Sequence, residues 1–341
     1  MHFELLAGAG IVFAAGVLQG TFALPMKYAR GWNHENIWLV FTFTGLVATP
    51  WLLTLATVPH LGEVYGLSPI RAISAIVGFG ALWGIGATLT GLGLSRLGIG
   101  LGLSILIGLS ASVGSLVPIL VLTPEMLKTH QGHVFLIGSA VMLLGIGVAA
   151  RAGALRDAGQ LREGDGPSSR GAFATGLLLC VCSGLLSGTL NFSYAFGTEV
   201  LRHAREMGAS AAWASNAIAA PATSGGFLAN LLYCGYKLMR NKSTRLYWPA
   251  GTRWNWGLGA SMGVLWFAGL ALYGFGASHM GSLGANLGWT LLMGTIVLTS
   301  NASGYISGEW SGAGRRPRLI LGAGLAIILF ALCILAMAQA A

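Results

Sequence analysis

Long apolar stretches alternate with short polar loops along the whole chain. Ten of these stretches reach roughly 20 mainly apolar residues without a central charge, which is the length an α-helix needs to cross a bilayer. They are Leu5 to Met26, Ile37 to Val58, Ile73 to Ser95, Leu101 to Leu122, Val134 to Ala150, Phe173 to Phe196, Ala211 to Tyr236, Trp256 to Phe275, Leu283 to Ile306 and Leu319 to Ala338. The period-two alternation typical of membrane barrels is missing from the sequence. The pattern predicts an all-α integral membrane protein with about ten transmembrane helices.

Composition agrees with a membrane protein and narrows the function classes. Of the 341 residues, 55% are hydrophobic and only 9% are charged, whereas a soluble domain carries about a quarter charged residues. The net charge of +9 comes from basic residues in short loops, so it indicates topology and not a nucleic-acid partner. The four cysteines lie in apolar stretches, with no disulfide framework and no zinc spacing. Because no basic segment precedes the first apolar stretch, we expect that stretch to be a helix and not a cleaved signal.

Basic residues are distributed unequally between the two sets of loops. Fifteen of the 19 lysines and arginines follow odd-numbered spans. The other loops hold Arg71, Lys128, Arg202 and Arg205. The positive-inside rule then places the basic loops in the cytoplasm and both termini outside it. The longest charged loop, residues 151–170, is predicted to be a cytoplasmic linker.

The two halves of the chain contain similar segments. Gly80 to Gly98 and Gly263 to Gly281 match at nine of 19 positions without a gap, including Trp83 and Trp266. A shorter similarity joins Gly16 to Thr21 with Gly184 to Thr189, although glycine-rich apolar helices also resemble one another by chance.

These similarities predict two five-helix repeats, residues 1–150 and 171–341. Since five is odd, the second repeat enters the membrane in the opposite direction. Inverted repeats are typical of alternating-access carriers, which bind substrate near the midplane. Spans 1, 3, 6 and 8 are therefore predicted to line a transport pathway.

Charged groups are almost absent from the spans, which argues against an enzyme. The acidic residues lie in loops or at span ends, and the His130 and His133 pair has no third ligand nearby. We expect no catalytic site, no metal site and no cofactor.

Uncharged hydrogen-bonding and aromatic side chains do occur in the spans. Amides and hydroxyls suit a neutral sugar, and an aromatic face suits the C–H face of its ring, whereas an anion would need a buried cation. The substrate-binding candidates are Gln19, Thr21, Trp83, Thr90, Asn191, Tyr194, Asn216, Trp266, Tyr273 and Trp289. Bonds between helices are the alternative role for many polar residues, Asn230 above all, and an interfacial belt is the alternative for the tryptophans. Pro221 is expected to break or kink span 7 and free backbone carbonyls.

Several motifs, in order along the chain, resemble one known family. The matching stretches are Gly20 to Lys27, Trp32 to Trp38, Gly80 to Gly86, Arg96 to Gly100, Arg151 to Gly153 and Gly308 to Pro317. They resemble the bacterial L-rhamnose/proton symporter family, a branch of the drug/metabolite transporter superfamily. The resemblance implies a ten-helix inner-membrane protein that takes up L-rhamnose, or a similar deoxy sugar, together with a proton.

Few ionisable groups are available to couple a proton to transport. Glu35 and Glu309, both near span ends, are the candidates. Their alternative roles are to cap span 2 beside Asn33 and to pair with Arg315 or Arg316.

The sequence as a whole predicts a secondary active transporter that imports a neutral monosaccharide, L-rhamnose, with protons by alternating access. The alternatives are a superfamily carrier for another small metabolite, and a membrane sensor or assembly subunit that transports nothing. Its partners would be the sugar, the proton and the bilayer. The sequence leaves the oligomeric state open.

Overall fold

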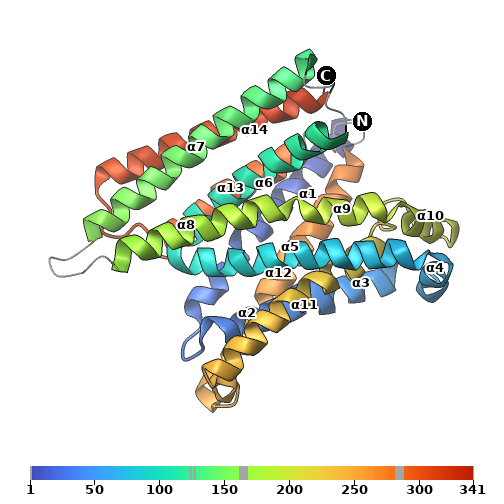
Figure 1. Cartoon of the computed structure of the whole chain (residues 1–341), viewed down its shortest axis with the longest axis horizontal. Helices are drawn as coiled ribbons and strands as arrows, with labels where there is room; N and C mark the ends of the chain where they lie inside the picture. The colour runs from blue at the N-terminus through green and yellow to red at the C-terminus, as the bar shows by residue number, and fades with distance from the viewer. Residues whose placement is uncertain (1, 123–124, 126–127, 161–167, 281–287, 341) are drawn as a thin grey trace. The chain divides into compact units, whose positions relative to one another are not determined.

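Helices make up the regular structure throughout the described residues (Figure 1). The structure is a computed structural model, and it describes residues 2–122, 125, 128–160, 168–280 and 288–340. Each of the ten predicted spans overlaps a helix within the described residues, and these residues contain no strand. Seven helical segments within them are long and apolar enough to cross a membrane. The prediction of an all-α membrane protein is confirmed, and the count of ten spans stays a prediction, because the helices around 99–122, 216–240 and 289–306 are not among the seven.

The helices vary widely in length, and short 3-10 and π segments join some of them. In chain order they are α1 (His2–Thr21), η1 (Leu24–Tyr28), α2 (His34–Phe43), η2 (Thr44–Ala48), α3 (Thr49–Thr57), α4 (Leu61–Leu67), α5 (Ile70–Leu97), α6 (Ile99–Leu122), α7 (His130–Gln160), α8 (Ser168–Ser187), α9 (Thr189–Phe196), α10 (Thr198–Glu206), α11 (Asn216–Arg240), η4 (Ser243–Tyr247), η5 (Ala250–Thr252), α12 (Trp254–His279), α13 (Trp289–Ile306) and α14 (Arg315–Ala340).

Some helix ends differ from the sequence prediction. Helix α7 continues to Gln160, so the first half of the predicted linker is helical, and residues 161–167 lie outside the described part of the chain. Arg151 and Arg156 lie in this extension, which the charge pattern predicts to be cytoplasmic, and an α-helix can extend past a bilayer because its backbone groups are bonded internally. Residues 281–287, where the ninth span was predicted to start, are also outside the described residues.

The chain forms two compact units that do not follow its linear order. Unit 1 consists of residues 1–21, 89–185 and 276–341, and unit 2 consists of residues 22–88 and 186–275. Both units therefore contain helices from each predicted half. Unit 2 holds span 2, most of span 3, spans 7 and 8, the end of span 6 and the whole of α10.

Helices α5 and α11 of unit 2 pack backbone to backbone at positions four residues apart. A Cβ atom at Gly80 would collide with the backbone of Ala222, and one at Gly84 with the backbone of Gly226. One turn further, the side chains of Thr88 and Asn230 hydrogen-bond at 3.0 Å. Small residues at this spacing permit close approach of membrane helices. We call these three pairs the α5–α11 ladder, and their order shows that the two helices run parallel.

A second close crossing in unit 2 joins η2 to α12. A Cβ atom at Gly45 would lie 3.0 Å from the Cα atom of Gly263. Gly45 belongs to the π-helical turn η2, which joins α2 to α3. A π turn inserts an extra residue into the helical ladder and widens it, and here it occurs where α12 comes closest.

Pro221 lies inside α11, yet the helix continues through it. The expectation that this proline would break the span is wrong. The predicted loss of a backbone hydrogen bond does occur, because proline has no N–H to bond the carbonyl four residues earlier. That carbonyl, on Ala217, accepts a hydrogen bond of 3.0 Å from the Tyr65 hydroxyl. Burial raises the pKa of Tyr65 above its usual range, so the hydroxyl stays a donor.

Unit 1 is built around two pairs of closely packed helices. Helix α7 runs beside α14 (Figure 1), where a Cβ atom at Gly324 would lie 2.7 Å from the backbone nitrogen of Ala149. Helix α1 packs on α13, where a Cβ atom at Gly16 would lie 2.7 Å from the methyl group of Thr295. In both units, glycines thus let a neighbouring helix approach the backbone closely.

Candidate functional site

Two tryptophans that correspond in the internal similarity contact each other in unit 2. The rings of Trp83 on α5 and Trp266 on α12 have centroids 5.6 Å apart and planes inclined by 31°. Both side chains are half-buried. Trp83 also covers Gly226 of α11, where an added Cβ atom would lie 2.8 Å from its ring. The geometry is that of a tilted aromatic pair with partly accessible faces.

Asn230 fixes the helices behind this pair. Its Oδ1 accepts from Trp38 Nε1 at 2.9 Å and from Thr88 Oγ1 at 3.0 Å, and its Nδ2 donates to the carbonyls of Gly226 at 2.9 Å and Gly84 at 3.2 Å. An amide side chain has two acceptor and two donor positions, and all four are used. Asn230 therefore has the structural role that the sequence favoured for it.

The other candidates in unit 2 lie away from the tryptophan pair. Asn216 is the first residue of α11, ten residues or about 15 Å along the helix from Gly226, and its Nδ2 donates to Thr57 Oγ1 at 3.0 Å. Tyr194 packs against an apolar cluster that includes Val64 and Ile218.

Two further candidates of unit 2 have different exposures. Asn191 on α9 is exposed. Tyr273 lies on α12, seven residues or about 10 Å beyond Trp266, and is half-buried.

The remaining four candidates lie in unit 1. Thr21 donates to the carbonyl of Val17 at 2.7 Å, so its proton is used within its own helix. Thr90 hydrogen-bonds Ser183 at 2.6 Å and joins α5 to α8. Gln19 is half-buried on α1, and Trp289, at the start of α13, is 36% exposed. Of the ten predicted binding residues, the structure brings Trp83 and Trp266 into ring contact.

Glu35, a candidate for proton coupling, is buried at the beginning of α2. Its Oε1 accepts from Asn241 Nδ2 at 2.7 Å, Ser243 Oγ at 2.8 Å and Asn33 Nδ2 at 3.3 Å. The cap of the helix is Asn33, whose backbone N–H donates to Asn36 Oδ1 at 3.2 Å. Glu35 is thus an acceptor that holds the end of α11 against the start of α2.

Glu309, the second candidate, lies between α13 and α14 in unit 1. Its Oε1 accepts from the backbone N–H of Ile99 at 2.6 Å, and its Oε2 accepts from that of Gly100 at 3.2 Å. A carboxylate is favourable there, because the first amides of a helix have no partner within it and the helix dipole is positive at that end. Glu309 therefore caps α6. The sequence does not indicate this role, because Glu309 and the start of α6 are far apart along the chain.

Sequence reasoning missed several polar residues that the structure brings together. Trp38 is fully buried and was not a candidate, although its indole N–H bonds Asn230. His203 on α10 is 8% exposed and contacts Ser68, 135 residues away. The only signal available in the sequence was a polar residue beside an apolar stretch, and that signal does not reveal a distant partner.

Metal binding finds no support in the described part of the chain. No three His, Cys, Asp or Glu residues gather there as they would around an ion. The four cysteines are free.

Comparisons with known proteins agree with the membrane fold. Residues 8–341 match the family model of the L-rhamnose-proton symport protein. The chain is 28% identical to an L-rhamnose-proton symporter of Salmonella typhi and 27% identical to one of Escherichia coli (strain SMS-3-5 / SECEC), each over 326 residues that cover 94% of both chains. The chain therefore belongs to the L-rhamnose-proton symport protein family, whose members are multi-pass inner-membrane transporters.

Proposed function

We propose that this protein imports L-rhamnose together with protons by alternating access between two inverted five-helix halves. Its relatives carry the names of L-rhamnose-proton symporters. The observation that carries the proposal within this chain is the contact between Trp83 and Trp266. These residues occupy equivalent positions in the predicted repeats, and two equivalent residues can touch only near the axis that relates them. Carriers of this class bind substrate near such an axis, at the midplane of the bilayer.

The helix contacts within unit 2 support the repeat. The sequence similarity pairs Gly80 with Gly263 and span 3 with span 8, and the predicted five-span repeat then pairs span 2 with span 7. Gly80 of span 3 meets Ala222 of span 7, and Gly263 of span 8 meets Gly45 of span 2. Equivalent glycines thus make the close crossings with equivalent partner spans, which is expected of two copies of one fold in opposite orientations.

The tryptophan pair is suited to a neutral sugar. An indole ring offers an apolar face to the C–H groups of a pyranose, and a deoxy sugar adds a methyl group that also prefers an apolar surface. Trp83 and Trp266 are each half-buried, so part of their surface is not covered by neighbouring side chains. Neither ring carries charge, which fits a substrate that is itself uncharged.

Glu35 would link a proton to helix position. As a carboxylate, its Oε1 accepts from Asn241, which follows α11, and from Ser243, which begins η4. Protonation removes the negative charge and weakens these charge-assisted hydrogen bonds. Weaker bonds would loosen the contact between the segment after α11 and the start of α2, where Asn36 still bonds the carbonyl of Ser243. Glu309 would act in the same way on the first turn of α6 in unit 1.

Orientation in the membrane is part of the proposal. The basic loops, including those with Glu35 and Glu309, are assigned to the cytoplasm, and both termini to the opposite side. Under this assignment the two glutamates receive or release the proton on the cytoplasmic side.

Uptake of radiolabelled L-rhamnose into cells that express the protein tests the function. We expect accumulation that a protonophore abolishes and that unlabelled L-rhamnose outcompetes more strongly than other sugars. Cells carrying the empty vector provide the background. No accumulation would overturn the assignment of L-rhamnose, accumulation that survives the protonophore would overturn proton coupling, and stronger competition by another sugar would change the substrate.

A further inference from the structure

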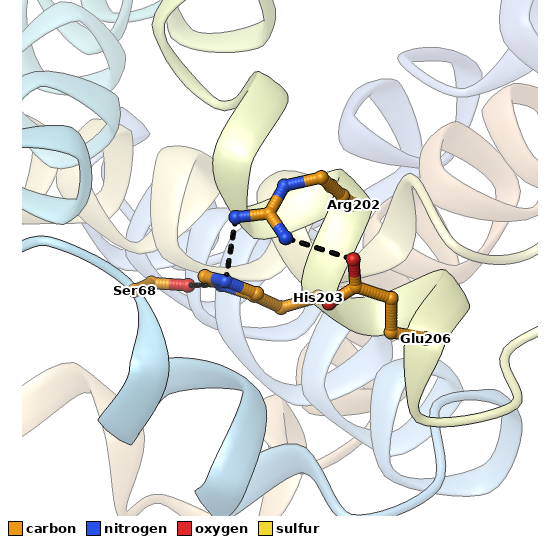
Figure 2. A network of polar contacts seen from close by, with 4 residues as sticks. All are labelled: Ser68, Arg202, His203 and Glu206. Atoms are coloured by element: carbon orange, nitrogen blue, oxygen red, sulfur yellow. Dashed lines mark hydrogen bonds and ion pairs between the residues drawn. The ribbon is translucent and has the colours of Figure 1, made fainter.

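A buried histidine forms a polar network at one end of unit 2 (Figure 2). His203 Nδ1 lies 3.0 Å from Ser68 Oγ, and its Nε2 lies 2.9 Å from a guanidinium nitrogen of Arg202. Ser68 Oγ donates to the carbonyl of Val64 at 2.7 Å. The other terminal nitrogen of Arg202 donates to Glu206 at 2.8 Å.

The chemistry of these partners fixes the proton on His203. A guanidinium only donates, so Nε2 of His203 must accept and cannot carry a proton. In the neutral ring the proton is then on Nδ1, which donates to Ser68 Oγ. Ser68 can accept it, because its own proton is directed to Val64. The network is complete only when His203 is neutral.

The network lies at the opposite end of α11 from Glu35. Asn216 and Ala217, at the beginning of α11, bond Thr57 and Tyr65 near Ser68, whereas Asn241 follows the end of α11 and bonds Glu35. Helix α11 has 25 residues, so its ends are about 38 Å apart.

The two ends also correspond in the predicted repeat. Glu35 follows span 1 and bonds Ser243, which follows span 7. His203 follows span 6 and bonds Ser68, which follows span 2. In each case a titratable group after the first span of one half bonds a serine after the second span of the other half. The correspondence gives His203 the same position at its end of unit 2 that Glu35 has at the other.

The charged groups around His203 come from α10 itself and from the helices packed against it. On α10 itself these are Arg202, Glu206, Glu199 and Arg205. Glu199 lies one turn before His203 and 3.7 Å from Arg71 of α5. On α4 the remaining groups are Glu63, which lies 3.4 Å from His60 just before the helix, and Tyr65, whose hydroxyl bonds Ala217. Helix α9 contributes Tyr194. The first residues of α11 carry no titratable side chain. The nearest charge to the ring is the guanidinium of Arg202.

We propose that His203 is a proton-coupling residue that accepts a proton from the aqueous phase at this end of the transporter. The inference rests on the proposed function and assigns the entry point of the proton. A water-borne proton adds to the Nε2 lone pair and gives an imidazolium with two N–H groups and no acceptor. The guanidinium nitrogen of Arg202 that bonded Nε2 then loses its acceptor, and Arg202 faces a second cation. A buried cation beside another is unfavourable, so the ring moves out towards Glu199 and Glu206 and leaves Ser68.

Release of Ser68 would reach the tryptophan pair through α5. Ser68 precedes α5, which begins at Ile70, and Trp83 lies 13 residues into that helix or about 20 Å along it. His203 is therefore a positioning residue for the site and does not itself contact the sugar.

The test separates coupling from sugar transport by using labelled L-rhamnose in two assays. Accumulation against a gradient requires the proton, whereas counterflow exchanges labelled for unlabelled sugar in protonophore-treated cells without net proton movement. We expect His203→Gln, which cannot titrate, to keep counterflow within about twofold of wild type and to lose accumulation about tenfold or more. Its accumulation should also lose the dependence on external pH that the wild-type protein shows near neutrality.

Two further variants make the test decisive. Arg202→Gln keeps a donor for Nε2 but removes the neighbouring cation, so the midpoint of the measured uptake profile should move to higher pH. His133→Gln, an exposed histidine on α7, is the matched control and should resemble wild type.

Each outcome has a defined meaning. Accumulation by His203→Gln with the wild-type pH profile overturns the inference, as does parallel loss of counterflow in a variant that reaches the membrane at wild-type level. Should His203→Gln fail to reach the membrane, an unchanged midpoint in Arg202→Gln overturns the inference and a raised midpoint supports it. If wild type itself shows no protonophore-sensitive accumulation, the proposed function fails first and this inference fails with it.

Discussion

Polar side chains inside unit 2 differ in how much hydrogen-bonding capacity they have left. Asn230 uses all four of its positions on protein groups, whereas the indole rings of Trp83 and Trp266 remain partly uncovered. A sugar can be bound only by groups that still have surface or hydrogen bonds to offer. Trp38 and Asn230 therefore belong to the scaffold, and the two paired tryptophans belong to the candidate site.

Replacing Asn230 should destabilise the protein. Asn230→Ala leaves the buried N–H of Trp38 without its acceptor, which costs about 1–3 kcal/mol. We expect a lower melting temperature for the purified protein in detergent, measured by fluorescence. Asn191→Ala, at an exposed position on α9, is the control and should melt like wild type. Equal melting temperatures for the two variants would contradict the scaffold role.

Replacing either paired tryptophan should affect transport more than folding. Trp83→Ala and Trp266→Ala each remove an aromatic surface worth about 1 kcal/mol, so the KM for L-rhamnose should rise roughly fivefold at unchanged membrane level. Trp254→Ala, which removes a 76% exposed tryptophan at the start of α12, is the control. If uptake falls only in proportion to the amount of protein in the membrane, the pair is a packing contact.

The residue-level predictions from sequence were limited by distance along the chain. Trp83 and Trp266 were identified because both lie in one recurring motif, but no pattern indicated that they touch. Asn216 and Thr21 were candidates because of their side-chain type, and the structure shows their groups bonded within the protein. Glu309 was expected near Arg315 or Arg316, while its contacts with Ile99 and Gly100 lie about 210 residues away.

Helix packing in unit 2 depends on positions that carry no side chain. Gly84 and Gly226 meet backbone to backbone, and Gly45 meets Gly263 at the π turn. The sequence contains many glycines and predicts helical spans, and the structure confirms the helices. It did not show which glycines lie at crossings, because crossing positions depend on the relative rotation of two helices.

A comparison of two glycines on α5 tests this packing. Gly84→Ala places a methyl group against the backbone of Gly226, whereas Gly78→Ala adds one where nothing lies within 4 Å. We expect Gly84→Ala to destabilise the protein by about 1–3 kcal/mol and to reduce L-rhamnose uptake. Gly78→Ala should be close to neutral in both measurements. Similar losses in both variants would mean that α5 does not approach α11 at Gly84.

At the scale of the whole molecule, the chain is sorted into two units that each combine both predicted halves. A boundary at residues 151–170 was the simplest expectation from sequence, since charge and Gly-Pro-Ser-Ser composition change there. Contacts follow a different division, because helices distant in sequence bury their small-residue faces against one another. Family membership and the all-α membrane fold could be predicted from sequence alone, whereas this sorting could not.

Labelling of single cysteines tests the proposed orientation. Ser210→Cys lies between α10 and α11 on the side predicted to be outside, and Ser311→Cys lies between α13 and α14 on the side predicted to be cytoplasmic; both positions are exposed. A membrane-impermeant maleimide should label the first in intact cells and the second only after permeabilisation. Wild type reports any labelling of the four native cysteines. The reverse pattern would invert the topology and place the His203 network in the cytoplasm.

The α5–α11 ladder has a consequence for motion. A slip of α5 by one turn, about 5.4 Å, would place Gly84 or Leu92 opposite Asn230 and separate Thr88 from it. Trp38, whose N–H bonds Asn230, would have to shift as well. Sliding is thus blocked, and α5 and α11 must turn or tilt as one lever. Pivots have to lie where the helical ladder is already irregular, and in unit 2 the π turn over Thr44–Ala48 is such a place.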